Sequence, residues 1–188
     1  MILIFSAPSG SGKSTLVNHL LQNRDDLEFS VSATTRAPRG SEQHGREYYF
    51  LEPENFRRLI DDDAFVEYEQ VYRDCYYGTL KSELDRIANN GHHAVFDVDV
   101  KGGANLKRIF GDDALALFIA PPSVDVLRDR LLTRGTDSPE KIEERVAKAE
   151  LEMQDAPLFD HVIVNDKLDD AKAETMSLVN EFLNKSKV

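Results

Sequence analysis

The sequence contains a single cysteine, Cys75, and comparatively few basic side chains. One thiol excludes a disulfide bond within the chain and is typical of a protein in the reducing cytoplasm. The 188 residues carry 23 Lys and Arg against 34 Asp and Glu, which gives a formal net charge of −11. A surface of this sign repels nucleic acids and anionic membranes. Any site for a phosphorylated ligand must therefore be a local cluster of basic residues.

Long apolar runs and flexible linkers are missing as well. No segment approaches the roughly 20 apolar residues that a membrane-spanning helix requires. Residues 1–5 are apolar, but they lack a basic leading segment and are too few for a signal peptide. No stretch rich in Pro, Gly or Ser divides the chain, and 41% hydrophobic residues suffice for a core. We therefore expect one cytoplasmic globular domain, long enough to carry a small inserted subdomain.

Apolar segments alternate with amphipathic ones along the chain. Their patterns predict strands at 1–5, 28–32, 47–51, 65–71, 93–99, 114–120 and 160–165. Helices are predicted at 16–21, 54–61, 80–89, 102–110, 123–134, from 138 onward, and at 168–183. Strands separated by helices predict an α/β fold with a doubly wound, mainly parallel sheet. Residues 32–77 carry less helix, and we expect a small antiparallel sheet there.

The stretch between the first strand and the first helix has the pattern of a phosphate-binding loop. Gly10 and Gly12 let backbone N–H groups converge on phosphate oxygens, in front of the positive end of the helix dipole. Lys13 would reach the terminal phosphates, and the Ser14 hydroxyl would bind Mg²⁺. The strict pattern has glycine at position 7, where this chain has Ala7. An ordinary glycine turn is the alternative, but the flanking strand and helix favour phosphate binding. The residues assigned to the nucleotide phosphates are Ala7, Pro8, Ser9, Gly10, Ser11, Gly12, Lys13, Ser14 and Thr15.

Two arginines stand three residues apart in a proline-containing turn. Arg36 and Arg39 provide planar guanidinium groups that make bidentate hydrogen bonds to phosphate, and Tyr48 follows in the next aromatic segment. This combination suits a phosphate dianion. A solvated basic turn explains the segment equally well when it is taken by itself.

Two acids lie where they could distinguish one purine from another. Glu67 belongs to an alternating strand, and Asp99 ends a buried one. An ionised carboxylate only accepts hydrogen bonds, and guanine offers it two neighbouring donors, N1–H and the 2-amino group. Adenine presents an acceptor at N1 instead, so a carboxylate there would accept from guanine and repel adenine. Two surface acids are the alternative interpretation.

Asp97 ends the same buried strand, at the edge of the sheet where α/β proteins bind ligands. Nucleotide enzymes place a carboxylate there to hold Mg²⁺ or its waters. The alternative is an acid that caps the following helix.

Three arginines surround a turn at 135–139 that would act as a hinge. Arg130 and Arg134 are four residues apart and share a helix face, and Arg145 lies on the next helix. Such a group would close over ATP and stabilise the charge on a transferring phosphoryl group. A salt-bridged surface helix is the alternative. No nucleophilic side chain stands beside a general base in this sequence. A phosphate acceptor needs no such base, because its oxygen attacks without losing a proton.

Taken together, these segments resemble guanylate kinases of the compact bacterial type. The resemblance runs nearly from end to end in the family's order, so it is far more specific than the loop alone. Its segments are 6–16, 29–40, 45–50, 65–68, 76–79, 96–102, 118–123, 134–136 and 162–166. Ala7 is familiar in the bacterial branch of this family.

The resemblance implies that the chain transfers the γ-phosphoryl group of ATP to GMP with the help of Mg²⁺. It implies a three-layer P-loop core at about 1–31, 80–122 and 156–188, a GMP-binding α+β insert at about 32–79, and a helical lid at about 123–155. It is compatible with a homo-oligomer.

Individual roles follow from position in the family's motifs. The resemblance assigns the phosphate of GMP to Ser32, Arg36, Arg39, Tyr48 and Tyr77, and its base to Glu67, Thr79 and Asp99. The same resemblance makes Gly78 a further substrate-binding residue. It assigns catalysis to Lys13, Arg36, Arg130, Arg134 and Arg145, and Mg²⁺ to Ser14 and, through water, Asp97, which also borders the substrate. Thr79 stands where the family often has serine.

Two other functions fit parts of the pattern. Guanylate kinase-like modules of membrane scaffold proteins have lost catalysis and bind phosphorylated peptides, but they typically degrade the phosphate loop, which is intact here. A P-loop kinase for another small phosphorylated acceptor, such as a ribose bisphosphate, is the second. Glu67 and the turn at 76–79 favour GMP over such an acceptor.

Overall fold

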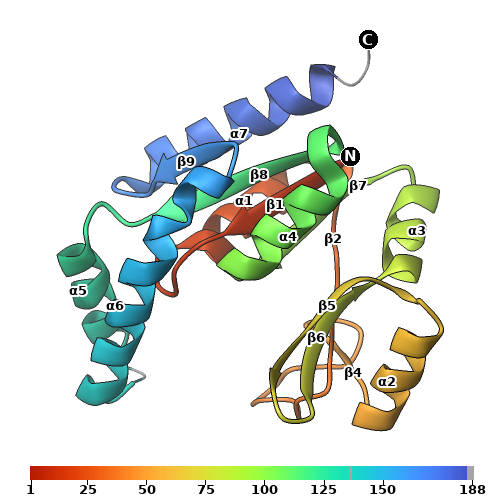
Figure 1. The fold of residues 1–188 in the computed structure, drawn as a ribbon. Helices are drawn as coiled ribbons and strands as arrows, with labels where there is room; N and C mark the ends of the chain where they lie inside the picture. The colour runs from red at the N-terminus through yellow and green to blue at the C-terminus, as the bar shows by residue number, and fades with distance from the viewer. Residues whose placement is uncertain (136, 186–188) are drawn as a thin grey trace. The chain divides into compact units, whose positions relative to one another are not determined.

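The computed structural model describes residues 1–135 and 137–185 (Figure 1). The chain forms two units, one of Met1–Asp25 with the described residues from Asp97 onward, the other of Asp26–Phe96. All the paired strands reported for the main sheet run parallel, which confirms the predicted α/β class. The spatial order of this sheet is β2 (Leu27–Phe29), β7 (His93–Val98), β1 (Ile2–Ser6), β8 (Ala114–Ala120) and β9 (His161–Val164).

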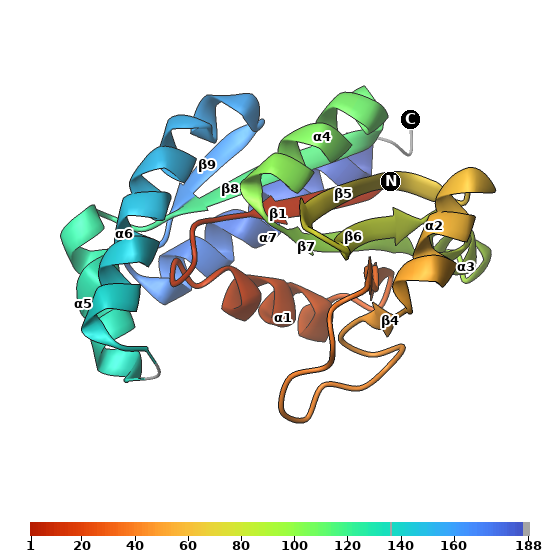
Figure 2. The ribbon, with the colours of Figure 1, turned by 60° about the horizontal axis from the view of Figure 1, so that its bottom comes forward.

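Buried apolar strands form the centre of the first unit. β1 pairs with β8, from Ile2 opposite Ala114 to Ser6 opposite Phe118, and β8 pairs in the same direction with β9. Helices α1 (Lys13–Asn23) and α7 (Leu168–Lys185) pack against each other, while α4 (Val100–Phe110) packs on β1 and β8. The α1–α7 pair and α4 lie on opposite faces of these strands (Figure 2). Because helices cover both faces, β8 must be apolar almost throughout, and this pattern predicted its bounds correctly.

Two helices, α5 (Val124–Arg134) and α6 (Pro139–Gln154), pack side by side in the first unit. Ser123 caps α5 by accepting from the Val126 N–H at 3.2 Å, and Ser138 caps α6, where Pro139 occupies the first turn. Their shared apolar core consists of Leu127, Leu131, Ile142, Val146 and Ala149. The hinge predicted at 135–139 includes Thr136, which lies outside the described residues. Short 3-10 turns, η1 (Gly111–Asp113) and η2 (Ala156–Leu158), precede β8 and β9.

The sheet of the second unit corrects one prediction. Its strands lie in the order β4 (Tyr49–Phe50), β3 (Ala33–Thr34), β6 (Cys75–Leu80) and β5 (Phe65–Tyr72). β6 is antiparallel to both β3 and β5, but β3 and β4 run parallel, so the sheet is mixed. The physical reason is the long connection at 35–48, which returns the chain to the end where β3 began. A short hairpin turn would have reversed its direction.

Stacked aromatic rings form a separate core in the second unit. Phe56 of α2 (Pro53–Asp61) is fully buried, and its ring stacks on Phe65 at 4.3 Å and on Tyr76 at 5.2 Å between centroids. Helix α3 (Lys81–Asn89) follows β6 directly. None of the helices in the described part of the chain combines the length and apolar character that crossing a membrane takes.

Several element ends differ from the predicted ones. The strand expected at 47–51 is only Tyr49–Phe50, and the one expected at 28–32 ends at Phe29. Helix α4 begins at Val100 rather than at residue 102, because Asp99 acts as its N-cap and accepts from the Gly102 N–H at 2.8 Å. The glycine pair at 102–103 suggested a helix start, whereas the capping carboxylate sets it.

An ion-pair network crosses the second unit at α3. Arg86 pairs with Glu83 at 2.9 Å and with Glu28, which also accepts from Asn90 at 3.0 Å and lies 3.1 Å from the His92 ring nitrogen. Burial alone would raise the pKa of Glu28. The hydrogen bonds from Arg86, Asn90 and His92 outweigh it and lower the pKa to about 2. The network therefore ties β2 to α3 and the turn that follows it.

We predict a loss of stability in acid that depends on Glu28. A carboxylate with a lowered pKa stabilises the fold fully above its ordinary value of 4.5, and this contribution is lost as the pH falls towards about 2. The free energy of unfolding, measured by urea titration, should therefore fall less steeply over this range in Glu28→Gln than in the wild type. Asp25→Asn, an exposed neighbour, should follow the wild-type curve. Equal slopes in Glu28→Gln and the wild type would contradict the role of this network.

Candidate active site

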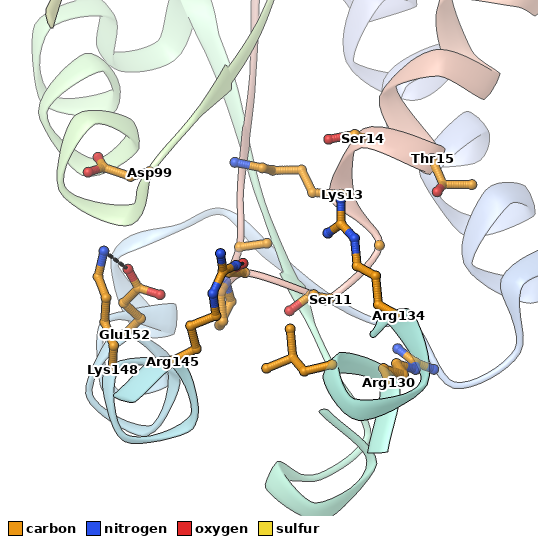
Figure 3. Close-up of a pocket in the computed structure, with 16 residues that line it drawn as sticks. Ser11, Lys13, Ser14, Thr15, Asp99, Arg130, Arg134, Arg145, Lys148 and Glu152 are labelled. Carbon is orange, nitrogen blue, oxygen red and sulfur yellow. Dashed lines mark hydrogen bonds and ion pairs between the residues drawn. The ribbon is translucent and has the colours of Figure 1, made fainter. Parts of the chain in front are cut away.

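A cavity of about 560 Å³ opens beside the start of α1 in the first unit (Figure 3). Residues 7–15 form one wall. The other lining residues come from α5, α6 and the start of α4 and are Asp99, Arg130, Leu131, Arg134, Arg145, Lys148 and Glu152. The structure thus brings together the predicted phosphate loop, the three predicted lid arginines and Asp99, which were separate in the sequence.

Two glycines give the loop its backbone conformation. Gly10 and Gly12 have φ values of +94° and +91°, a region that favours glycine. A Cβ on Gly12 would lie 2.3 Å from Nδ2 of Asn165, and one on Gly10 would lie 2.9 Å from Leu127. Ala7 has no positive φ, so its methyl group is tolerated where the strict pattern has glycine.

Asn165, directly after β9, holds the loop in place. Its buried side chain donates from Nδ2 to the carbonyl oxygen of Ser11 at 2.7 Å. Its backbone N–H donates to Ala120 at 2.8 Å, and its carbonyl oxygen accepts from Nη2 of Arg130 at 2.8 Å. One residue therefore connects the loop, β8 and α5. No sequence motif gives Asn165 a role, although the rule that ligands bind at the carboxyl ends of parallel strands points to it.

Lys13, Ser14 and Asp97 contact one another at the start of α1. Nζ of Lys13 lies 2.7 Å from Asp97 and donates to the Val98 carbonyl oxygen at 2.6 Å, while the Ser14 hydroxyl donates to Asp97 at 3.0 Å. Within the described ranges there is no group of three or more His, Cys, Asp or Glu that could hold a metal ion. Mg²⁺ at nucleotide sites uses one or two protein oxygens together with phosphates and waters. The Ser14 hydroxyl and the Asp97 carboxylate fit that requirement.

Helix α6 reaches the loop through Arg145. Its Nη1 donates to the Ser9 hydroxyl at 2.6 Å, and its Nε lies 3.3 Å from Asp137. Lys148 and Glu152, which the sequence analysis did not single out, pair with each other at 3.3 Å on the same wall (Figure 3). They follow Arg145 by three and seven residues, so the three share one helix face. This spacing is a signal that could have found them.

Arg36 lies at the centre of the basic cluster predicted in the second unit. Its two terminal nitrogens donate to the carboxylate of Glu42 at 2.6 and 2.8 Å, and its Cζ lies 4.8 Å from the Tyr48 ring centroid. A hydrogen bond to Tyr77 also raises the pKa of Arg36, after the larger effect of Glu42. Glu42 accepts from the Arg39 N–H at 2.8 Å as well, and the two arginines lower the pKa of Glu42 to about 2. Glu42 was not among the site residues predicted from the sequence.

Two of the residues assigned to guanine, Glu67 and Thr79, face each other across the paired strands β5 and β6. Glu67 lies opposite Thr79, whose buried hydroxyl donates to the Glu67 carboxylate at 2.9 Å. A Cβ on Gly78 would lie 2.8 Å from the Glu67 carbonyl oxygen, so only glycine fits there. Ser32, on the neighbouring segment, accepts at its carbonyl oxygen from the Tyr49 N–H at 2.9 Å.

Comparisons with known proteins match the chain to one family over nearly its whole length. The family model described as guanylate kinase matches residues 1–184. The chain belongs to the guanylate kinase family. The guanylate kinase of Bacteroides thetaiotaomicron is 58% identical over 184 residues, which cover 98% of this chain and 90% of that protein. The guanylate kinase of Porphyromonas gingivalis is 55% identical over 185 residues, 98% of each chain. A crystal structure of guanylate kinase from Anaplasma phagocytophilum matches with a TM-score of 0.74 at 28% identity, covering 96% of this chain and 85% of that one.

Guanylate kinase membership confirms the resemblance recognised in the sequence motifs. The chain is accordingly an ATP:GMP phosphotransferase with ATP as its phosphoryl donor. The comparisons give no support to the alternative of an inactive, phosphopeptide-binding module of the guanylate kinase type.

We predict that Gly12→Ala impairs ATP binding, whereas Gly91→Ala does not. Both glycines have positive φ, +91° and +76°, so both variants share the backbone strain. A Cβ on Gly91 meets nothing within 4 Å, while one on Gly12 meets the amide of Asn165. Gly12→Ala should weaken ATP binding by about tenfold, as expected when one buried hydrogen bond is lost. Isothermal titration with ATP measures this, and equal affinities in the two variants would show that the clash does not affect the site.

Proposed function

We propose that residues 7–15 bind the triphosphate of ATP while residues of the second unit bind GMP as the phosphoryl acceptor. The observation that supports the donor site most strongly is the concentration of positive charge around one loop. A single cavity is lined by the cationic side chains of Lys13, Arg130, Arg134 and Arg145, in a chain whose net charge is −11. Cations gathered in this way attract a polyphosphate that the rest of the surface repels.

At the donor site, backbone and side chains act on different phosphates. The N–H groups of the loop and the N-terminal end of α1, which starts at Lys13, face the inner phosphates. Lys13 and the three arginines act on the terminal phosphate, where negative charge develops during transfer. Arg145 already reaches Ser9 of the loop, so α6 lies close enough to supply such a charge.

We assign Mg²⁺ to Ser14 and Asp97. The Ser14 hydroxyl would be a direct ligand, and Asp97, 3.0 Å from it, would hold a bound water. When bound, Mg²⁺ neutralises charge on the phosphates. Asp97 also pairs with Lys13, so the same carboxylate keeps the lysine ammonium group beside the phosphate site.

In the second unit, we assign the GMP phosphate to Ser32, Arg36, Arg39, Tyr48 and Tyr77. Arg36 supports this assignment best, because Glu42 holds one edge of its guanidinium group and Tyr48 lies against its face. A guanidinium held in this way loses little conformational freedom when it binds an anion.

We assign recognition of guanine to Glu67, Gly78, Thr79 and Asp99. The Thr79 hydroxyl donates to one oxygen of Glu67 at 2.9 Å and orients the carboxylate, whose oxygens only accept hydrogen bonds and therefore suit the donors of guanine. Asp99 lies in the other unit, where one of its oxygens caps α4.

The reaction requires positioning and charge stabilisation rather than a general base. The attacking group is a phosphate oxygen of GMP, which is already ionised at neutral pH. We assign the lid to residues of about 123–155, the GMP-binding insert to about 32–79 and the core to the remainder. A cytoplasmic location is part of the same proposal and is supported by the single cysteine.

We predict that Lys13→Met lowers kcat by about 100-fold or more, the usual cost of removing one charge-stabilising donor. A coupled assay of ADP release measures this, with GMP, AMP, CMP and UMP offered side by side and only GMP accepted efficiently. Lys81→Met removes an exposed ammonium group in the second unit and should keep wild-type turnover. Normal kcat in Lys13→Met would remove this lysine from the transfer step.

We predict that Glu67→Gln weakens the preference for GMP over AMP. An amide presents its own donors to the N1–H edge of guanine, so kcat/KM for GMP should fall by about tenfold to 100-fold. Glu54→Gln, an exposed change on α2, is the matched control. An unchanged ratio of kcat/KM for GMP and AMP in Glu67→Gln would refute this assignment.

A further inference from the structure

A buried carboxylate of the second unit holds the chain beside two residues assigned to the GMP phosphate. Glu83 lies in the first turn of α3, and only 2% of it is exposed. Its Oε1 accepts from the Val31 N–H at 2.9 Å, and its Oε2 accepts from the Tyr49 hydroxyl at 2.9 Å. Val31 directly precedes Ser32, and Tyr49 directly follows Tyr48.

A further hydrogen bond joins the two segments that Glu83 holds. The Tyr49 N–H donates to the carbonyl oxygen of Ser32 at 2.9 Å. These hydrogen bonds thus join α3, the segment before β3, and β4 in one connected network. A displacement of Glu83 would therefore move the backbone at Ser32 and Tyr48 together, and misplacement of binding groups by a fraction of an ångström weakens a site.

Arg86 supplies the charge that keeps Glu83 ionised. Its Nε lies 3.0 Å from Oε2 of Glu83, and its Nη2 lies 2.9 Å from Oε1. Burial would raise the pKa of Glu83, but the hydrogen bonds from Arg86, Val31 and Tyr49 outweigh burial and lower it. Glu83 is therefore an acceptor for four donors at neutral pH.

Stability alone does not explain a buried charge at this position. The apolar core of this unit is made by other residues, among them Ala33, Phe56 and Phe65. Well-packed apolar side chains often stabilise a protein as much as a buried ion pair of the same volume. A carboxylate adds direction, because it holds an amide and a hydroxyl group in one defined geometry.

We propose that Glu83 is a positioning residue for the phosphate of GMP. The inference rests on the proposed function, in which Ser32 and Tyr48 bind that phosphate. Glu83 acts through Val31 and Tyr49, whose backbones it holds in the geometry needed for binding. Such preorganisation lowers the entropic cost of binding GMP, so its loss appears in KM for GMP rather than in kcat or KM for ATP.

Steady-state kinetics with each substrate varied separately test the proposal. Glu83→Gln removes the charge and should raise KM for GMP by about tenfold, in the range found when hydrogen bonds to charged groups are lost. Tyr49→Phe removes one hydroxyl group and should raise it by about threefold to fivefold. In both variants, kcat and KM for ATP should stay within about twofold of the wild type. Asp85→Asn, an exposed acid on the same helix, should match the wild type throughout.

The outcomes separate positioning from a structural role. Unchanged KM for GMP in both variants overturns the proposal even if the melting temperature falls, and so does an equal rise in KM for ATP. If Glu83→Gln does not fold, Tyr49→Phe decides the question. Arg36→Met tests the phosphate site itself. If Arg36→Met raises KM for GMP while Glu83→Gln keeps the wild-type constants, only the positioning role is refuted. If Arg36→Met leaves KM for GMP unchanged, the assignment of the phosphate site is refuted.

Discussion

The hydrogen bond from Asn165 to the carbonyl oxygen of Ser11 is the interaction on which the geometry of the cavity depends. The amide nitrogen occupies the space that a Cβ at residue 12 would fill, so the loop turns with glycine at that point. The carbonyl oxygen of Asn165 also anchors Arg130. The loop and the first helix of the α5–α6 pair therefore share one support at the end of a buried parallel sheet, where ordered backbone is least free to move.

Three of the cations in the two sites have carboxylate partners that orient them. Lys13 pairs with Asp97, Arg145 with Asp137, and Arg36 with Glu42. Pairs that are open to solvent contribute little to the stability of a fold. Their value here is that a long, flexible side chain is held in one direction, so less freedom is lost when an anion binds. An acidic chain can in this way present oriented positive charge at the sites where a phosphate binds.

Local patterns predicted much of the fold, and long-range contacts account for what they missed. The loop, the helix caps at Ser123 and Ser138, and the strand at 114–120 depend on residues close together in the chain. Asn165 and Ser11 are 154 residues apart, and Glu83 and Val31 are 52 residues apart, so neither partner is visible near the other. In a sequence, Glu42 and Glu83 look like ordinary surface acids. The parallel pairing of β3 and β4 likewise depends on the path of a long loop.

In the second unit, the carboxylate of Glu83 accepts hydrogen bonds from both Tyr49 and Arg86. These contacts make the evolution of the three residues interdependent. Replacing Glu83 alone removes the acceptor of the Tyr49 hydroxyl, and replacing Arg86 alone removes the cation that offsets the buried carboxylate of Glu83. A different side chain at position 83 is therefore tolerated best when positions 49 and 86 change with it. The three positions form an epistatic group, in which the fitness effect of each residue is set by the identity of the other two.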